Sequence, residues 1–152
     1  MDLSKLKWVF IIVIVIGGGW LVTAGGINWV YGNATKATPG VDADKDSVDE
    51  STLTRYGGFL LSTFRYNKAR HFYNTAIERY PNGTNVWWNY YQMARCEEKL
   101  ENYQEAANIL HMLWLEDADQ YDERVPGMAT LKLRLDNLVE IHGLESYDER
   151  RR

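Results

Sequence analysis

The chain has 152 residues, of which 45% are apolar, and its formal net charge is −4 at pH 7. This length accommodates one domain with an appendage, and an acidic chain without a basic patch does not fit a nucleic-acid-binding protein. Cys96 is the only cysteine, which excludes an internal disulfide and a cysteine-based zinc or haem site.

The first apolar segment has the character of a membrane anchor. Residues 8–31, WVFIIVIVIGGGWLVTAGGINWVY, carry no charge, and a helix of this length reaches roughly 36 Å, enough to cross a hydrocarbon core of about 30 Å. The alternative is a cleaved signal peptide, because Lys5 and Lys7 precede the run and Ala24 ends a small-residue site. Since the apolar run continues past that site to Tyr31, we expect an uncleaved, single-pass transmembrane helix.

The flanking charges predict an orientation for this helix. Residues 1–7 contain Lys5 and Lys7, whereas the residues that follow the span contain more aspartates than lysines. Positively charged flanks favour the cytoplasmic side. We therefore expect residues 1–7 to form a short cytoplasmic N-terminus and residues 32–152 to lie on the outer side, which is the periplasm in a bacterial inner membrane.

Glycines within the apolar segment predict a packing face. Gly18 and Gly25 lie seven positions apart, as do Gly19 and Gly26, so each pair shares one side of a continuous helix. Small residues allow another helix to approach the backbone closely. We expect these glycines to pack against a helix of a partner, or against a lipid or pigment. Simple tolerance of glycine in membrane helices is the alternative.

Residues 32–50 have the composition of a flexible acidic linker. Asp42, Asp44 and Asp46 alternate as in the first half of a calcium-binding loop. Ser47 stands at the position where that loop requires glycine, and the glutamate that closes the loop is also missing. A solvated linker is therefore favoured over a calcium site, and we predict no metal site.

From Ser51 the apolar residues recur at helical spacing. This predicts an all-α domain over residues 51–143, followed by a charged C-terminal tail, residues 144–152. Pro81 and the two residues after it are expected to end one of the helices.

Two segments of this domain share a pattern of tyrosine, alanine and apolar residues. They are YNKARHFYNTAIERYP, residues 66–81, and YQEAANIL, residues 103–110. The pattern resembles the tetratricopeptide repeat. The residues that carry the resemblance are Gly57, Tyr66, Ala69, Tyr73, Ala76 and Pro81 in the first copy, and Ala94, Tyr103 and Ala106 in the second. The resemblance implies about two helical hairpins and a C-terminal capping helix.

The second copy departs from the family pattern. The offset from Tyr66 to Tyr103 is 37 positions, whereas the family repeat has about 34. Leu113 replaces an alanine, and no proline closes the second copy. The alternative is an unrelated helical bundle whose aromatic stripes are simply core.

The resemblance also implies a binding groove, because the first helix of each hairpin lines the inner surface of tetratricopeptide arrays. The matching positions are Thr54, Gly58 and Leu61 in the first copy and Trp88, Tyr91, Arg95 and Lys99 in the second. Exposed aromatic side chains beside arginine are typical interface anchors. Cover of Trp88 and Tyr91 by the C-terminal helix is the alternative. The basic clamp with which some members bind C-terminal carboxylates is not matched.

No catalytic constellation or cofactor-binding motif stands out, since His71, His111 and His142 are scattered along the chain. We therefore predict a protein without enzymatic activity or cofactor. The favoured function is an accessory or scaffold subunit of a larger membrane protein complex, with the other subunits as partners. The alternative is a membrane-tethered adaptor or chaperone-like factor that transiently binds exported proteins.

Overall fold

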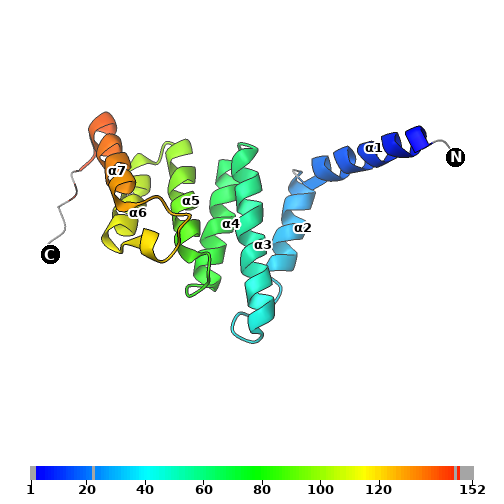
Figure 1. Cartoon of the computed structure of the whole chain (residues 1–152), viewed down its shortest axis with the longest axis horizontal. Coiled ribbons are helices and arrows are strands. Elements are labelled where there is room, and N and C mark those ends of the chain that lie inside the picture. Colours follow the sequence, from blue (N-terminus) through cyan, green and yellow to red (C-terminus); the bar gives the residue numbers. More distant parts are fainter. Residues whose placement is uncertain (1–2, 22, 146, 148–152) are drawn as a thin grey trace. The chain divides into compact units, whose positions relative to one another are not determined.

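The computed structural model describes residues 3–21, 23–145 and 147, and none of these lies in a β-strand. The all-α class predicted from the sequence is therefore confirmed. The helices are α1 (Leu3–Leu21), α2 (Ala24–Ala34), α3 (Ala43–Ser62), α4 (Tyr66–Arg79), α5 (Val86–Lys99), α6 (Tyr103–Leu115), the short 3-10 helix η1 (Ala118–Gln120) and α7 (Met128–His142) (Figure 1). The chain divides into two units, Met1–Ala37 and Thr38–Arg152.

The first unit contains α1 and α2, which are bent by 74° relative to each other. Thr23 forms the junction: its hydroxyl donates to the Trp20 carbonyl at 2.6 Å and accepts from the Gly26 backbone N–H at 3.4 Å. A Cβ atom at Gly26 would lie 2.5 Å from the Trp20 carbonyl oxygen. Glycine is therefore required at this close approach of the two helices.

This bend changes the expectation of one helix over residues 8–31. Within the described residues, no single helix has both the length and the apolar composition to cross a membrane, whereas α1 and α2 meet those criteria jointly as a bent pair. Gly18 and Gly19 belong to α1, and Gly25 and Gly26 belong to α2. The pairs spaced by seven residues therefore do not share one helix face, because that prediction assumed an unbroken helix.

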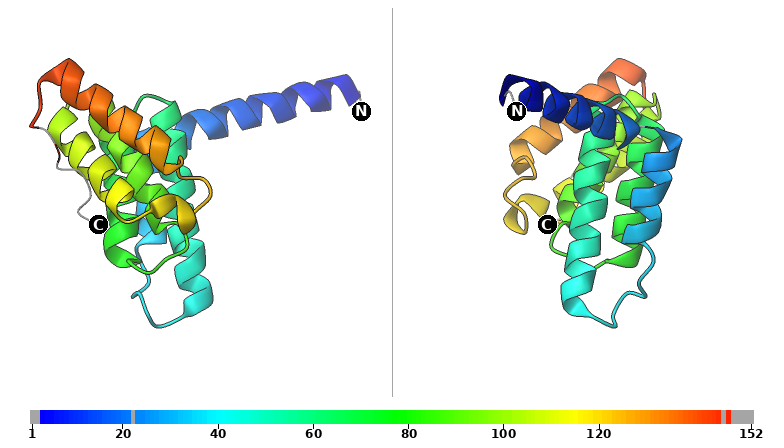
Figure 2. Two further views of the ribbon diagram at one scale, coloured as in Figure 1. Left: turned by 60° about the vertical axis from the view of Figure 1, so that its left-hand side comes forward. Right: turned by 90° about the vertical axis from the view of Figure 1, so that its right-hand side faces the viewer.

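The second unit is a succession of packed helices. Each of α3 to α6 packs on the next, and α7 packs on α6 (Figures 1 and 2). Leu53, Leu60, Phe72 and Tyr73 are buried between α3 and α4, and Leu110, Leu113, Leu131 and Leu135 are buried in the cluster that joins α5, α6 and α7. Burial of such side chains contributes about 1.5–3 kcal/mol each to folding.

Helix α3 begins at Ala43, inside the segment that was expected to be a linker up to residue 50. The Asp42 carboxylate accepts from the backbone N–H groups of Asp44 at 3.1 Å and Lys45 at 3.2 Å. Asp44 and Asp46 occupy the first turn, where negative charge favours the positive end of the helix dipole. The aspartates therefore start a helix in the structure, and residues 43–50 are not linker.

Helices α3 and α5 end in the same way. Phe64 and Glu101 follow them with left-handed φ angles of 61° and 63°. At both ends the next residue donates its backbone N–H to a carbonyl five positions earlier, at 2.9 Å, which is the pattern of a Schellman helix end. Phe64 and Glu101 lie 37 positions apart, the same offset as between Tyr66 and Tyr103.

The residues that suggested a repeat include three pairs with the same burial at an offset of 37 positions: Gly57 and Ala94, Tyr66 and Tyr103, and Ala69 and Ala106. Gly57, Ala69, Tyr73, Ala76, Ala94 and Ala106 are buried, Tyr66 and Tyr103 are half-buried, and Pro81 is exposed. A Cβ atom at Gly57 would lie 2.9 Å from the Tyr73 ring. The absence of a side chain at Gly57 therefore allows α3 and α4 to pack closely.

Candidate protein-binding groove

A groove lies along α3 and α5 in the second unit. It consists of two adjoining cavities of about 270 and 310 Å³, which share Gly58 and Gln92. The residues from α3 are Ser51, Thr54, Arg55, Gly58, Leu61 and Ser62, and those from α5 are Trp88, Gln92, Arg95 and Lys99. Steps of three and four residues place each set on one helix face, which is why the sequence pattern could indicate the groove.

Most of the predicted groove positions line these cavities, but Tyr91 does not. Trp88, Arg95 and Lys99 are among the lining residues. The Tyr91 hydroxyl instead accepts from Arg134 of α7 at 2.8 Å, and the Arg134 guanidinium lies 5.5 Å from the centre of the Tyr91 ring. The C-terminal helix therefore engages Tyr91, while Trp88 stays in the groove wall.

Two hydroxyl groups are buried beneath the groove and have no hydrogen bond. Thr54 is 7% exposed and Tyr73 is 0% exposed, and both line the cavity of about 270 Å³. Among the described residues, neither hydroxyl has a hydrogen-bond partner. Burial raises the pKa of Tyr73, so its hydroxyl remains protonated and able to donate at ordinary pH. Leaving such a group unsatisfied costs about 1–3 kcal/mol.

The role of Tyr73 in the groove was missed by the sequence analysis, which assigned this residue to helix packing alone. Its ring lies against Gly57, and its hydroxyl oxygen is 3.6 Å from the place where a Cβ atom would stand on Gly58. The adjacent glycines let this α4 side chain lie directly against α3, beneath the cavity of about 270 Å³. In the sequence, the adjacent residues Gly57 and Gly58 were the feature that could have indicated this close contact of Tyr73 with α3.

The groove is lined by positive charge although the chain is acidic. Arg55, Arg95, Lys99 and Arg124 line the two cavities, and no aspartate or glutamate does. Arg124 is neutralised by Asp122 at 2.6 Å. Burial acts to raise the pKa of the Asp122 carboxyl, but the hydrogen bonds and charge of Arg124 hold it below its ordinary value.

The other three cations of the groove have no such partner. Across the described part of the chain, the ion pairs do not include Arg55, Arg95 or Lys99. Arg95 donates instead to the neutral amide of Gln92 at 2.9 Å. The groove therefore presents three uncompensated positive charges.

An exposed aromatic residue stands at one end of the groove. Phe64 is 79% exposed and lines the cavity of about 310 Å³ together with Leu61 and Tyr66. Its ring meets the Tyr66 ring edge-on, with centroids 6.2 Å apart. Phe64 was not among the predicted site residues, because its helical spacing from Leu60 and Leu61 indicated a packing position, whereas in the structure it follows the end of α3.

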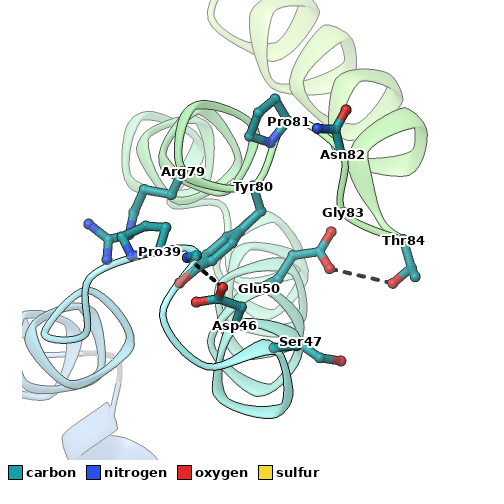
Figure 3. Close-up of a pocket in the computed structure, with 12 residues that line it drawn as sticks. Pro39, Asp46, Ser47, Glu50, Arg79, Tyr80, Pro81, Asn82, Gly83 and Thr84 are labelled. Carbon is teal, nitrogen blue, oxygen red and sulfur yellow. Dashed lines mark hydrogen bonds between the residues drawn. The ribbon is translucent and has the colours of Figure 1, made fainter.

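A separate cavity, of about 400 Å³, lies between the start of α3 and the loop after α4 (Figure 3). Glu50 accepts from the Asn85 backbone N–H at 2.8 Å and from the Thr84 hydroxyl at 3.4 Å, and Asp46 accepts from the Gly40 backbone N–H at 2.7 Å. These carboxylates hold loops in place. Within the residues that the structure covers, no cluster of three metal-ligating side chains occurs.

Comparison of the chain with protein-family models, with curated proteins and with solved structures found no match. The function therefore has to be inferred from the groove and from the apolar N-terminal segment.

Proposed function

We propose that the protein is a non-catalytic accessory subunit of a membrane protein complex, and that the groove between α3 and α5 binds a peptide segment of a partner subunit. The observation that carries this proposal is the set of cations Arg55, Arg95 and Lys99, which line the groove without an ion-pair partner in the described part of the chain. The side chains of a bound peptide can supply the charge that these groups lack.

The repeated hairpins support a protein-binding role. The helix ends at Phe64 and Glu101 share one geometry at an offset of 37 positions, and Gly57 and Ala94, which lie at the same offset, are both buried. These features favour a tetratricopeptide-like domain of about two repeats. Such arrays present the first helix of each hairpin to ligands, which is the role that we assign to α3 and α5.

The apolar character of α1 supports anchoring in a membrane. Trp8, Val9, Phe10, Ile11, Ile12, Val13, Ile14, Val15 and Ile16 are between 46% and 68% exposed. A continuous apolar surface of this kind needs cover, and a bilayer provides it. We assign the bent pair of α1 and α2 to the membrane, with residues 1–7 in the cytoplasm and the second unit on the outer side, as the flanking charges favour.

Site-specific photo-crosslinking in native membranes tests the proposal. A photoreactive phenylalanine analogue is placed at Arg55 or Ser62, which are exposed residues of the groove, and in matched control variants at Glu78 of α4 or Glu105 of α6, which are exposed outside it. We expect one or two discrete products from the groove positions. The partner in these products should also co-purify in a fixed ratio in mild detergent.

Other outcomes decide against this function. Many faint products with exported proteins, none in a fixed ratio, would indicate a tethered adaptor. Equal crosslinking from the groove and the control positions, or crosslinking from the control positions alone, would contradict binding in the groove.

A further inference from the structure

The end of the groove at Phe64 combines an apolar surface with positive charge. Leu61, Phe64 and Tyr66 line the same cavity as Arg95 and Lys99. No acidic residue lines that cavity, and neither cation has an ion-pair partner in the described part of the chain. A ligand that fits this end must bring both an apolar side chain and negative charge.

The backbone conformation at Phe64 shows that this position is not optimised for folding. Phe64 has φ of 61°, a left-handed conformation that glycine adopts freely and that a residue with a side chain adopts at a cost. Glycine is also the usual residue at this position of a helix end. Because the Phe64 ring is 79% exposed, its burial within the chain contributes little free energy to offset that cost.

We propose that the groove takes an acidic peptide segment carrying one large apolar side chain, and that Phe64 is the ring against which this side chain packs. The inference rests on the proposed function, since it names the chemistry of the segment that the groove binds. Arg55, Arg95 and Lys99 attract the acidic side chains of the segment. The surface of Leu61, Phe64 and Tyr66 holds its apolar residue. Complementary charge identifies this occupant, because a basic or neutral segment leaves the three cations unpaired.

Glu101 provides a matched control for Phe64. It occupies the same position at the end of α5, with φ of 63°, and it does not line the groove. Glycine at either position relieves the left-handed strain. We therefore expect Phe64→Gly and Glu101→Gly each to raise the Tm by roughly 3–6 °C, whereas only Phe64→Gly removes a binding group.

Fluorescence anisotropy with the full chain in mild detergent tests the proposal. The probes are three labelled twelve-residue peptides: an acidic peptide with a central leucine, the same peptide with glutamine and asparagine for its acids, and the acidic peptide with alanine for its leucine. We expect the acidic peptide with leucine to bind at least 10-fold more tightly than the other two peptides. Its preference over the neutral peptide should become smaller at higher salt concentration, because salt screens the charges. Phe64→Gly should weaken its binding by 5-fold or more, and Glu101→Gly should change it by less than 2-fold.

Each contrary result identifies which idea fails. Equal binding of the acidic and neutral peptides overturns the assignment of acidic ligands. Unchanged binding by Phe64→Gly overturns the role of Phe64 in holding the apolar side chain of the peptide. If no probe binds while Arg55 and Ser62 still crosslink to one partner, the acidic class is wrong and the proposed function stands. If the probes do not bind and the groove does not crosslink, both are wrong.

Discussion

Gly57 and Gly58 are neighbours in sequence, but they have different surroundings. A Cβ atom at Gly57 would lie 2.9 Å from the Tyr73 ring, which is fully buried. We predict that Gly57→Ala destabilises the protein by about 1–3 kcal/mol, because overpacking of the α3–α4 contact outweighs the gain of about 0.5–1 kcal/mol from replacing glycine in a helix. Urea unfolding followed by circular dichroism measures the difference.

Gly58→Ala is the control for this prediction. Its Cβ atom would lie 3.6 Å from the Tyr73 hydroxyl, which is an ordinary contact distance. Only the helix preference then remains, so the variant should be more stable than the wild type by about 0.5–1 kcal/mol. Stabilisation by both substitutions would show that the Tyr73 ring does not lie against Gly57.

Single residues of the groove were predictable where helical spacing is combined with the resemblance to the tetratricopeptide repeat, which assigns the groove to the first helix of each hairpin. Trp88, Arg95 and Lys99 follow that spacing along α5 and line the groove. Tyr91 follows it too, but its partner Arg134 is 43 positions away in sequence, so no local pattern could reveal the contact. Phe64 also fits the helical spacing of the apolar residues, but α3 ends at Ser62, so Phe64 lies in the helix end and its ring is exposed.

At the scale of elements, Glu50 joins α3 to the start of α5. It is 3% exposed and accepts from the backbone N–H of Asn85 at 2.8 Å. We predict that Glu50→Ala destabilises the protein by about 1–3 kcal/mol, because the Asn85 N–H loses its partner. Glu50→Gln keeps an acceptor and loses only the charge near the start of α5, so its effect should be about half as large.

Thermal unfolding of the two Glu50 variants measures this order of stability. Equal Tm values for Glu50→Ala and the wild type would show that the carboxylate does not hold the loop before α5. Equal losses in Glu50→Gln and Glu50→Ala would show that the negative charge, which both variants remove, is what matters, and not the acceptor.

The extent of α3 also shows where sequence reasoning stops. Residues 43–50 contain many charges and few apolar residues, so composition indicated a linker. The structure makes them helical through the Asp42 cap and through the bond of Glu50 to a residue 35 positions later. A cap is a local signal and could have been weighed more heavily, whereas the contact of Glu50 depends on the tertiary fold.

At the scale of the whole molecule, the helical class followed from spacing sustained over many residues, which is a strong signal. The bend at Thr23 did not follow from the sequence, because the run from Trp8 to Tyr31 is apolar on both sides of Thr23. The bend rests on the close approach of Gly26 to the Trp20 carbonyl. Glycine is also common in straight membrane helices, so its presence alone did not predict a break.

Membrane anchoring by the apolar segment gives the last prediction. Val13 and Ile16 of α1 are 62% and 67% exposed, and Val41 and Val48 of the second unit are 80% and 63% exposed. If the surroundings of both pairs were water, arginine would be tolerated at either. In a bilayer, two arginines near the middle of the span cost roughly 5–7 kcal/mol.

We therefore expect Val13→Arg/Ile16→Arg to move the protein from the membrane fraction to the supernatant on alkaline carbonate extraction, and Val41→Arg/Val48→Arg to leave it in the membrane. Release of neither variant would contradict insertion of this part of α1 in the bilayer, because alkaline carbonate strips proteins that are held by protein contacts alone. Release of the wild type would contradict a transmembrane anchor. Because the two pairs are similarly exposed within the chain, a difference between them reports on what surrounds α1 and not on how the chain folds.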